Sequence, residues 1–322
     1  MTSGREINYA LRPAKSIERK IMCEFFLKAS ELYSDISQYT YIGFGSFYFS
    51  DFALFHKRLR INKMYSIEKD SYHKARYDFN KPYHCITMKY ASSSIVLNTI
   101  IKREESEKYF IWLDYDGYFS KSIIDDLKTC INKLSAGSYI CISFSLGMGL
   151  DPKINLYDYI KEEAGNYISP ELKIGDVCNK SIANIIWGVL QEVIKESIKS
   201  KNSAVDTADT DKYSIEQIMY FQYKDNVPMM TICFMVARNK ERQFLIDYDA
   251  LKLDFYKKGN VSYDISVPQL TWLEVRKINT LLPSENEQQV IEGIPFIDPS
   301  DLQEYIKVYK YYPNYLEGQD TL

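Results

Sequence analysis

The sequence predicts an α/β protein built on a mostly parallel β-sheet with helices on both faces. Short apolar, β-prone runs alternate with amphipathic segments of helical length between residues 38 and 145, and this alternation favours parallel strands joined by crossover helices. A glycine turn follows the first β-prone run directly, and an acidic residue follows the second. Two later apolar runs flank a short polar stretch at 237–242, which predicts a closing antiparallel hairpin.

Composition narrows the class of protein. The chain has 322 residues, of which 46% are hydrophobic and 26% charged, and its formal net charge is −3. This length allows one large or two modest domains. The net charge argues against a protein that coats nucleic acid non-specifically, although it leaves a local basic patch open. No apolar run approaches the roughly 20 residues that cross a bilayer, so no membrane partner is expected.

The cysteines and histidines point away from disulfides and metal. The six cysteines form no CxxC pair, which indicates free thiols in a reducing, cytoplasmic compartment. Cys141 and Cys233 lie in apolar runs and are expected to be buried. The N-terminal residues lack the apolar core of a signal peptide. The three histidines have no ligand-pair spacing, so no histidine-based metal site is expected.

The expected elements follow one another in a regular order. Residues 7–38 carry apolar side chains at near-helical spacing, and Arg12-Pro13 supplies a start signal, which predicts an opening helical region. After it we expect strand 40–44, helix 50–59, strand 63–67, a short helix 70–77, strand 84–88, helix 91–101, strand 109–113, helix 121–134 and strand 138–144.

Residues 151–226 interrupt this alternation and are expected to form a helical and loop insertion. Within it, residues 182–198 are a strong helix candidate. Residues 199–211 contain almost no apolar side chain, so we expect a surface loop there. The closing hairpin is assigned to strands 229–236 and 243–246 around the polar stretch 237–242.

Three regions follow from this order: an N-terminal helical region (1–37), a main domain (38–248) and a C-terminal extension (249–322). We expect the extension to begin with a helix from Asp264 to about Leu281. Its apolar residues, among them Trp272, Ile294, Phe296 and Tyr305, predict that it packs against the main domain. A protein partner, if there is one, would bind through this extension.

The glycine turn is the first candidate binding feature. Gly43-Phe44-Gly45 ends the first strand, and Glu68 ends the second, about 20 positions further on. A strand that runs into a glycine turn and then a helix presents backbone N–H groups to a nucleotide-like ligand, and an acidic residue at the next strand tip suits the two hydroxyls of a ribose. The alternatives are a tight turn without a ligand and a solvated strand-end charge.

Two further groups of residues are candidates at this stage. Asp114, Tyr115 and Asp116 close the most hydrophobic strand and are candidate catalytic residues, although their carboxylates would serve equally as helix caps or as a Mg²⁺ pair. No third ligand is identifiable, so no metal is assigned. Arg12 and Lys15 lie on a basic edge, which is either a solvated face or a lip that binds a phosphate or carboxylate of the substrate.

The order of these features resembles class I S-adenosylmethionine-dependent methyltransferases over residues 38–248. The resemblance implies a Rossmann-like sheet of seven strands, with the last strand inserted antiparallel, and S-adenosylmethionine lying across the strand tips. It further implies that Gly43, Phe44, Gly45 and the adjacent Ser46 contact the methionine part, that Glu68 and the adjacent Lys69 bind the ribose, that Tyr90 and Ala91 border the adenine, and that Asp114 and Tyr115 face the methionine end and the acceptor.

The chain departs from that family's pattern in two places. The turn lacks a third glycine, and the preceding strand has Thr40 and Tyr41 where an acidic residue is usual. The Asn/Asp-Pro-Pro-aromatic signature of amino-directed DNA enzymes is absent, while Leu-Asp-Tyr-Asp-Gly is nearer to O-methyltransferases. The resemblance therefore favours methyl transfer to an oxygen of an unidentified acceptor. The alternatives are a catalytically inactive adaptor of the same fold and, less favoured, a nucleotide-binding oxidoreductase.

Overall fold

The computed structural model describes residues 12–205, 210–284 and 286–313, and a single eight-stranded sheet forms its centre. In chain order the strands are β1 (Thr40–Phe44), β2 (Lys63–Ile67), β3 (Ile86–Lys89), β4 (Tyr109–Tyr118), β5 (Tyr139–Ser145), β6 (Ser214–Lys224), β7 (Pro228–Ala237) and β8 (Tyr263–Ile265). Across the sheet the order is β3-β2-β1-β4-β5-β7-β6-β8. β7 pairs antiparallel with β5 and β6, while the other pairings are parallel.

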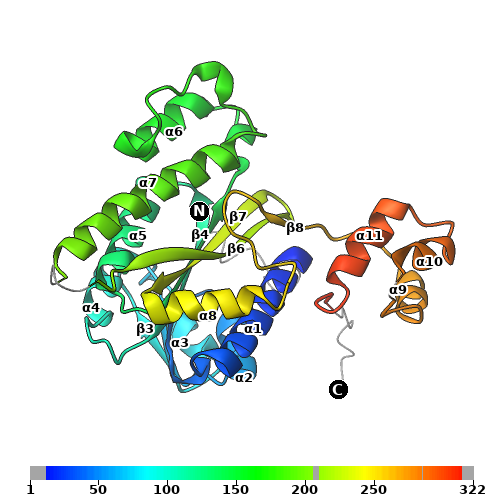
Figure 1. Cartoon of the computed structure of the whole chain (residues 1–322), viewed down its shortest axis with the longest axis horizontal. Coiled ribbons are helices and arrows are strands. Elements are labelled where there is room, and N and C mark those ends of the chain that lie inside the picture. The colour runs from blue at the N-terminus through cyan, green and yellow to red at the C-terminus, as the bar shows by residue number, and fades with distance from the viewer. Residues whose placement is uncertain (1–11, 206–209, 285, 314–322) are drawn as a thin grey trace.

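Helices cover both faces of the sheet, as the alternation of elements predicted (Figure 1). Side chains from α1 (Pro13–Leu32), α2 (Ser50–Leu59), α3 (Lys74–Asn80) and α8 (Asn239–Asp249) join the core on one face. Those from α4 (Ser93–Ile100), α5 (Lys121–Lys133), α6 (Leu156–Ala164) and α7 (Ile182–Ser203) join the core on the other. The α/β fold class with a mostly parallel sheet is therefore confirmed.

The strand β4 shows why the sheet has two cores. Successive side chains of a strand point to opposite faces. Phe110 and Trp112 therefore pack with α1 and α2 in one core, whereas Ile111 and Leu113 pack with α4 and α5 in the other. All four are at most 1% exposed. A strand that is buried on both faces has a continuous run of apolar residues in its sequence, and the run at residues 109–113 predicted this strand.

The antiparallel hairpin is present, and one of its two predicted strands is correct: residues 229–236 lie in β7. Its partner is β6, which comes from the segment assigned to a helical and loop insertion. Residues 243–246 lie in α8 instead, because Phe244, Leu245 and Tyr248 are buried at helical spacing and Glu241 accepts from the amide of Arg238 at 2.9 Å. A run of three apolar residues, Phe244 to Ile246, fits a helix as well as a strand, so the sequence alone did not decide.

Two element boundaries also differ from prediction. β4 continues to Tyr118, so Asp114 and Asp116 lie within the end of the strand rather than in a turn after it. α7 continues to Ser203, so the first part of the predicted loop 199–211 is helical. Residues 206–209 of that loop lie outside the described residues.

The C-terminal extension adds one strand and three helices, α9 (Trp272–Asn279), α10 (Glu287–Glu292) and α11 (Pro299–Val308). β8 pairs with β6 at the edge of the sheet, and Figure 1 shows the three helices as a lobe beyond it. The predicted helix starting at Asp264 is wrong: β8 occupies that position, and α9 begins after Thr271, whose side chain accepts from the amide of Glu274.

The apolar residues of the extension divide differently from the prediction. Ile294 and Tyr305 are buried in a small core that the three helices form among themselves. Trp272 and Phe296, expected to pack inward, are 61% and 75% exposed. The C-terminal extension contacts α1 at Lys20, whose Nζ donates to the carbonyl oxygens of Tyr311 at 2.9 Å and Tyr312 at 3.1 Å.

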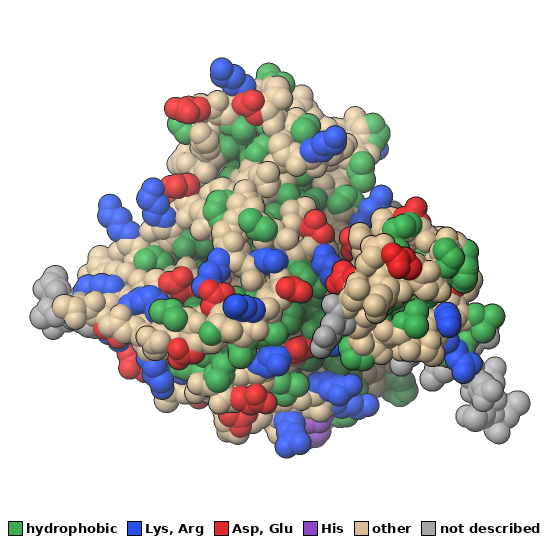
Figure 2. All heavy atoms as spheres, turned by 45° about the vertical axis from the view of Figure 1, so that its right-hand side comes forward, with side chains coloured by type: hydrophobic (Ala, Val, Ile, Leu, Met, Phe, Trp, Pro, Cys, Tyr) green, Lys and Arg blue, Asp and Glu red, His purple; other side chains and the backbone are tan. Residues whose placement is uncertain are grey.

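The surface and the cysteines agree with the composition. Positive and negative side chains are interspersed on the face shown in Figure 2. The six cysteines are free, and Cys141 and Cys233 are fully buried as predicted. Over the described parts of the chain, every helix is too short or too polar to cross a membrane.

Candidate active site

A cavity of about 500 Å³ opens where β1, β2, β3 and β4 end. Parallel strands bring their carboxyl ends to one edge of the sheet, which is where open α/β sheets bind ligands. The cavity therefore collects residues that are far apart in the sequence. The predicted site residues that line it are Phe44, Gly45, Ser46, Glu68, Lys69, Ala91, Asp114, Tyr115 and Asp116.

Four other predicted site residues are not on the cavity wall. Gly43 lies inside β1, paired with Ser66 and Trp112 in the neighbouring strands. The hydroxyl of Tyr90 donates to the carbonyl of Lys74 at 3.1 Å and to Asp78 at 2.9 Å.

Arg12 and Lys15 do not form the exposed basic edge that the sequence suggested. The guanidinium Nε of Arg12 donates to Asp225 at 3.3 Å, and Lys15 is completely buried. An exposed lip was the wrong expectation because the turn between β6 and β7, which the sequence cannot place, lies over this part of α1.

Gly45 is required where the chain leaves β1. Its amide donates to the carbonyl of Ile67 at 3.0 Å, which holds the turn against β2. A Cβ built at this position would collide with the Oγ of Ser66. The close approach explains a glycine here without a left-handed backbone conformation.

Glu68 stands at the end of β2 with its side chain on the cavity wall. Its amide donates to the carbonyl of Lys89 at 3.0 Å, and its Oε1 accepts from the amide of Asp70 at 2.9 Å. Burial raises the pKa of Glu68 above its usual value, against the hydrogen bond from Asp70. The backbone thus holds the carboxyl group at the strand tip, as the sequence predicted.

Tyr115 and Asp126 form a second fixed pair on the wall. The hydroxyl of Tyr115 donates to Oδ2 of Asp126 at 2.7 Å, and its ring meets that of Phe44 edge to face, with centroids 5.0 Å apart. Burial raises the pKa of both the tyrosine hydroxyl and the Asp126 carboxyl. Tyr115 is therefore a neutral, fixed aromatic surface. The periodicity of α5 places Asp126 among its buried positions, but nothing local linked it to Tyr115.

The start of α1 is held by a residue from the far end of the main domain. Arg12, at the N-cap position, gives no side-chain cap. Instead Asp225, in the turn between β6 and β7, accepts from the amides of Ala14 at 2.9 Å and Lys15 at 3.2 Å. A carboxylate on the first amides of a helix satisfies donors that have no partner within the helix and interacts favourably with the helix dipole.

The first turns of α1 place two cations beside the cavity. Lys15 Nζ lies 2.8 Å from Oδ1 of Asp114, and Arg19 lies 2.8 Å from Oδ1 of Asp51. Arg19, Asp51 and Asp114 all line the cavity. Arg19 and Asp51 are functional candidates that only the structure brings forward, although both lie on amphipathic helices next to buried residues.

The cavity wall carries more negative than positive groups. Six carboxyl groups line it, against the two cations Arg19 and Lys69; the carboxyl groups belong to Asp51, Glu68, Asp114, Asp116, Asp125 and Asp126. Such a wall favours a positively charged ligand over a negatively charged one. Within the described residues, no three His, Cys, Asp or Glu side chains are grouped closely enough to hold a metal ion.

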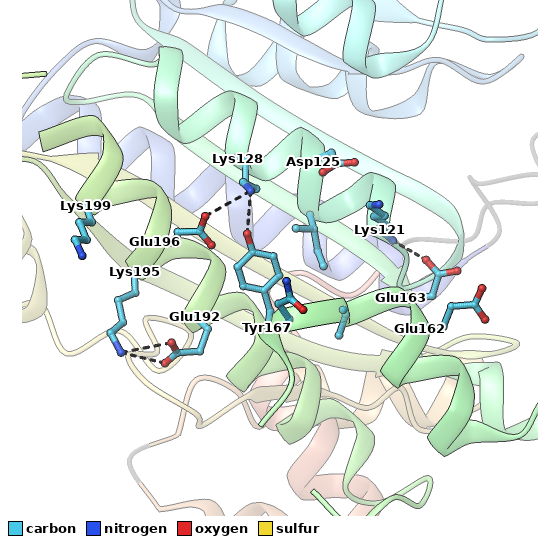
Figure 3. Close-up of a pocket in the computed structure, with 14 residues that line it drawn as sticks. Lys121, Asp125, Lys128, Glu162, Glu163, Tyr167, Glu192, Lys195, Glu196 and Lys199 are labelled. Atoms are coloured by element: carbon cyan, nitrogen blue, oxygen red, sulfur yellow. Dashed lines mark hydrogen bonds and ion pairs between the residues drawn. The ribbon is translucent and has the colours of Figure 1, made fainter. Parts of the chain in front are cut away.

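A second cavity, of about 580 Å³, lies between α5, α6 and α7 (Figure 3). Several of its charged side chains form pairs. Lys128 Nζ contacts the hydroxyl of Tyr167 at 2.8 Å, and Lys195 contacts Glu192 at 3.4 Å. None of the strand-tip residues described above lines this cavity. The two cavities share Asp125, which lies on α5.

Residues 7–319 match the model of a family described as "Putative O-methyltransferase". No curated protein sequence matches the chain. Among solved structures, the chain is similar to a probable spermidine synthase from Corynebacterium glutamicum, at 10% identity over 80% of this chain and 82% of that one, with a TM-score of 0.41.

The chain is also similar to Trm1 from Pyrococcus horikoshii, at 12% identity over 71% of this chain and 57% of that one, with a TM-score of 0.39. A third similar structure is the O-methyltransferase TomG from Streptomyces achromogenes, at 11% identity over 72% of this chain and 91% of that one, with a TM-score of 0.33. These likenesses are too distant to support an activity. The family match spans nearly the whole chain, confirms the resemblance to methyltransferases, and shows that this protein belongs to the "Putative O-methyltransferase" family.

Proposed function

We propose that this protein is an S-adenosylmethionine-dependent methyltransferase that transfers a methyl group to an oxygen of its acceptor. The observation that carries the proposal is the cavity at the strand tips, which brings the glycine turn after β1 and Glu68 after β2 onto one wall. Its volume of about 500 Å³ lies in the range of small-molecule sites. The excess of carboxyl groups on its wall suits a cofactor that carries a positively charged sulfur.

The residues present allow a specific placement of this cofactor. Glu68 would accept hydrogen bonds from the two ribose hydroxyls, and Ala91 and the serines after it would border the adenine. Asp114 would face the methionine end, where its Oδ2 accepts from the ammonium group. When bound, the cofactor supplies a methyl group activated by the sulfonium charge and leaves as a neutral thioether.

Asp114 would also serve the acceptor. Its carboxylate would orient the hydroxyl group of the acceptor and would accept its proton as the methyl group is transferred. A carboxylate would suffice for this, because the attacking oxygen becomes strongly acidic as its bond to carbon forms. The rest of the rate enhancement would come from alignment in a site that excludes water.

A thermal-shift titration tests the proposal. The full-length protein is heated alone and with increasing S-adenosylmethionine or S-adenosylhomocysteine, with adenosine and ATP as control ligands. A ligand at 100 times its dissociation constant should add about 2.7 kcal/mol to the free energy of unfolding. A melting temperature unchanged by either cofactor form would refute the proposal and favour an inactive adaptor of the same fold.

A further inference from the structure

We propose that Lys15 is a positioning residue of the methyl-transfer site, which keeps Asp114 ionised with one oxygen turned to the cavity. The inference rests on the proposed function, and it assigns to α1 a role in the reaction centre in addition to covering the sheet. Lys15 would act through Asp114 without touching the substrate. The contacts of its ammonium group carry the argument.

Polar groups enclose the ammonium group of Lys15. It donates hydrogen bonds to Oδ1 of Asp114 at 2.8 Å and to the hydroxyl of Tyr223 at 3.0 Å, and it lies 2.8 Å from Oε2 of Glu18 in an ion pair. The ring of Trp112 is the fourth neighbour, with its centroid 4.3 Å from Nζ, which adds a cation–π interaction. Such a group has little freedom to move.

Burial makes this pairing strong. The side chains of Lys15 and Glu18 are both 0% exposed, and that of Asp114 is 14% exposed, on the cavity side. Burial alone would lower the pKa of Lys15, but the carboxylates of Asp114 and Glu18 outweigh it and raise the pKa. Lys15 is therefore a permanent cation at any physiological pH. It holds Oδ1 of Asp114, so Oδ2 is the carboxylate oxygen that Lys15 leaves unoccupied.

Asp114 would be unfavourably placed without this cation. The charged and titratable groups around it come from five elements: Lys15, Glu18 and Arg19 on α1, Asp51 on α2, Tyr41 on β1, Tyr223 on β6, and Tyr115 and Asp116 beside it on β4. Three of these are other carboxyl groups, and Arg19 is already paired with Asp51. Removal of Lys15 would leave Asp114 next to like charges in a poorly hydrated place, where a carboxyl group gains a proton readily.

The position of Lys15 is set by the docking of α1. The turn between β6 and β7 holds the amide of Lys15 itself through Asp225, at 3.2 Å. Tyr223, on the strand that leads into that turn, contacts the other end of the same side chain. One segment of the sheet thus fixes both the backbone and the ammonium group of Lys15.

The test measures how binding of S-adenosylhomocysteine depends on pH, by titration calorimetry from about pH 6 to about pH 8. Four forms of the full-length protein are compared: wild type, Lys15→Met, Asp114→Asn and the double variant Lys15→Met/Glu18→Gln. The double variant removes one charge of each sign and is near-isosteric at Glu18, so it keeps the test open if Lys15→Met alone does not fold. The melting temperature of each ligand-free form is the control for folding.

The proposal predicts a distinctive pattern. Wild type keeps a level affinity across this range, and Asp114→Asn binds weakly at every pH. Lys15→Met and the double variant bind about tenfold more weakly than wild type near pH 6 and approach wild-type affinity near pH 8, because Asp114 loses its added proton as pH rises.

Two results would overturn the inference while leaving the proposed function intact. In one, both lysine variants bind as wild type does at every pH. In the other, they are weakened equally at every pH, which is the signature of a role in packing alone. A wild-type protein that binds neither cofactor form at any pH would overturn the proposed function, and the inference with it.

Discussion

Lys15 and Asp114 are 99 positions apart in the sequence, and their side chains form a 2.8 Å ion pair behind the wall of the cavity. One residue belongs to the first helix and the other to the end of a central strand. The pair joins the N-terminal helical region to the strand tips. The residues that hold this pair, and those that line the cavity, give the following predictions.

Glu68→Gln should weaken binding of S-adenosylmethionine at least about tenfold while the melting temperature of the ligand-free protein stays unchanged. The amide oxygen can still accept from Asp70, so the strand tip keeps its shape. The two ribose hydroxyls, however, lose a charged acceptor, and hydrogen bonds to charged groups are worth about 1.5–3 kcal/mol each. Titration calorimetry measures the affinity.

Glu107→Gln is the matched control for Glu68. It is the same exchange at a surface ion pair with Lys63, just before β4 and therefore at the opposite edge of the sheet. It should leave the affinity unchanged. Equal affinities of Glu68→Gln and wild type would show that Glu68 does not bind the ribose.

Gly45→Ala should destabilise the protein by about 1–3 kcal/mol, the range typical of overpacking. The added methyl group meets the Oγ of Ser66, which is buried and has no hydrogen-bond partner among the described residues. Ser66→Ala removes that oxygen, and the Cβ of Ser66 is an acceptable 3.7 Å away. The double variant should therefore recover most of the lost stability, which urea denaturation measures.

Gly117→Ala is the control for Gly45, because nothing lies within 4 Å of a Cβ at that position. It should be close to neutral. If Ser66→Ala fails to rescue Gly45→Ala, the collision is not with the Ser66 hydroxyl, and the need for glycine in this turn has another cause.

Glu18→Gln should stabilise the protein near neutral pH and lose that advantage in acid. Burial raises the pKa of Glu18 above its usual value despite the nearby Lys15. A carboxyl group with a raised pKa in the folded state contributes stability below its unfolded pKa of 4.5, and this contribution is lost as pH rises through the folded value. Gln, which stays neutral, avoids that loss. Urea denaturation at about pH 4 and pH 7.5 compares the two proteins.

Glu31→Gln, the same exchange at an exposed position of the same helix, serves as the reference for Glu18. Its effect should not depend on pH in this way. A Glu18→Gln protein that is less stable than wild type at neutral pH and equal to it in acid would reverse the sign, and would mean that the attraction of Lys15 outweighs burial.

In the C-terminal lobe, Ile294→Ala should cost about 2–5 kcal/mol, whereas Trp272→Ala should change the free energy of unfolding by less than about 0.5 kcal/mol. Ile294 is fully buried among the three helices, and Trp272 is 61% exposed. Hydrogen exchange of the α9–α11 amides reports the lobe directly. A large loss of protection in Trp272→Ala would show that this side chain is covered in solution.

Part of this architecture could be predicted because it depends on local sequence. The β-prone runs at residues 40–44 and 109–113 and the amphipathic segment at 121–134 differ in their period, which sets the element type with little help from the rest of the chain. Gly45, Glu68 and Asp114 could be named as site residues for a related reason. Each lies near the carboxyl end of a parallel strand, and parallel strands end at a common edge.

Tertiary structure decided what depends on partners far away in the sequence. The run 243–246 became a helix because Phe244, Leu245 and Tyr248 are buried together at helical spacing, and Trp272 stayed exposed outside the small core of the lobe. The sequence left Lys15 as either a cation of a solvated face or part of a lip that binds the substrate. It is buried because Asp225, Tyr223 and Asp114, all about a hundred or more positions away, surround its backbone and its ammonium group. The spacing of apolar residues and the residues of a turn are properties of the local sequence. Burial and charge pairing depend instead on which distant segments the fold brings together.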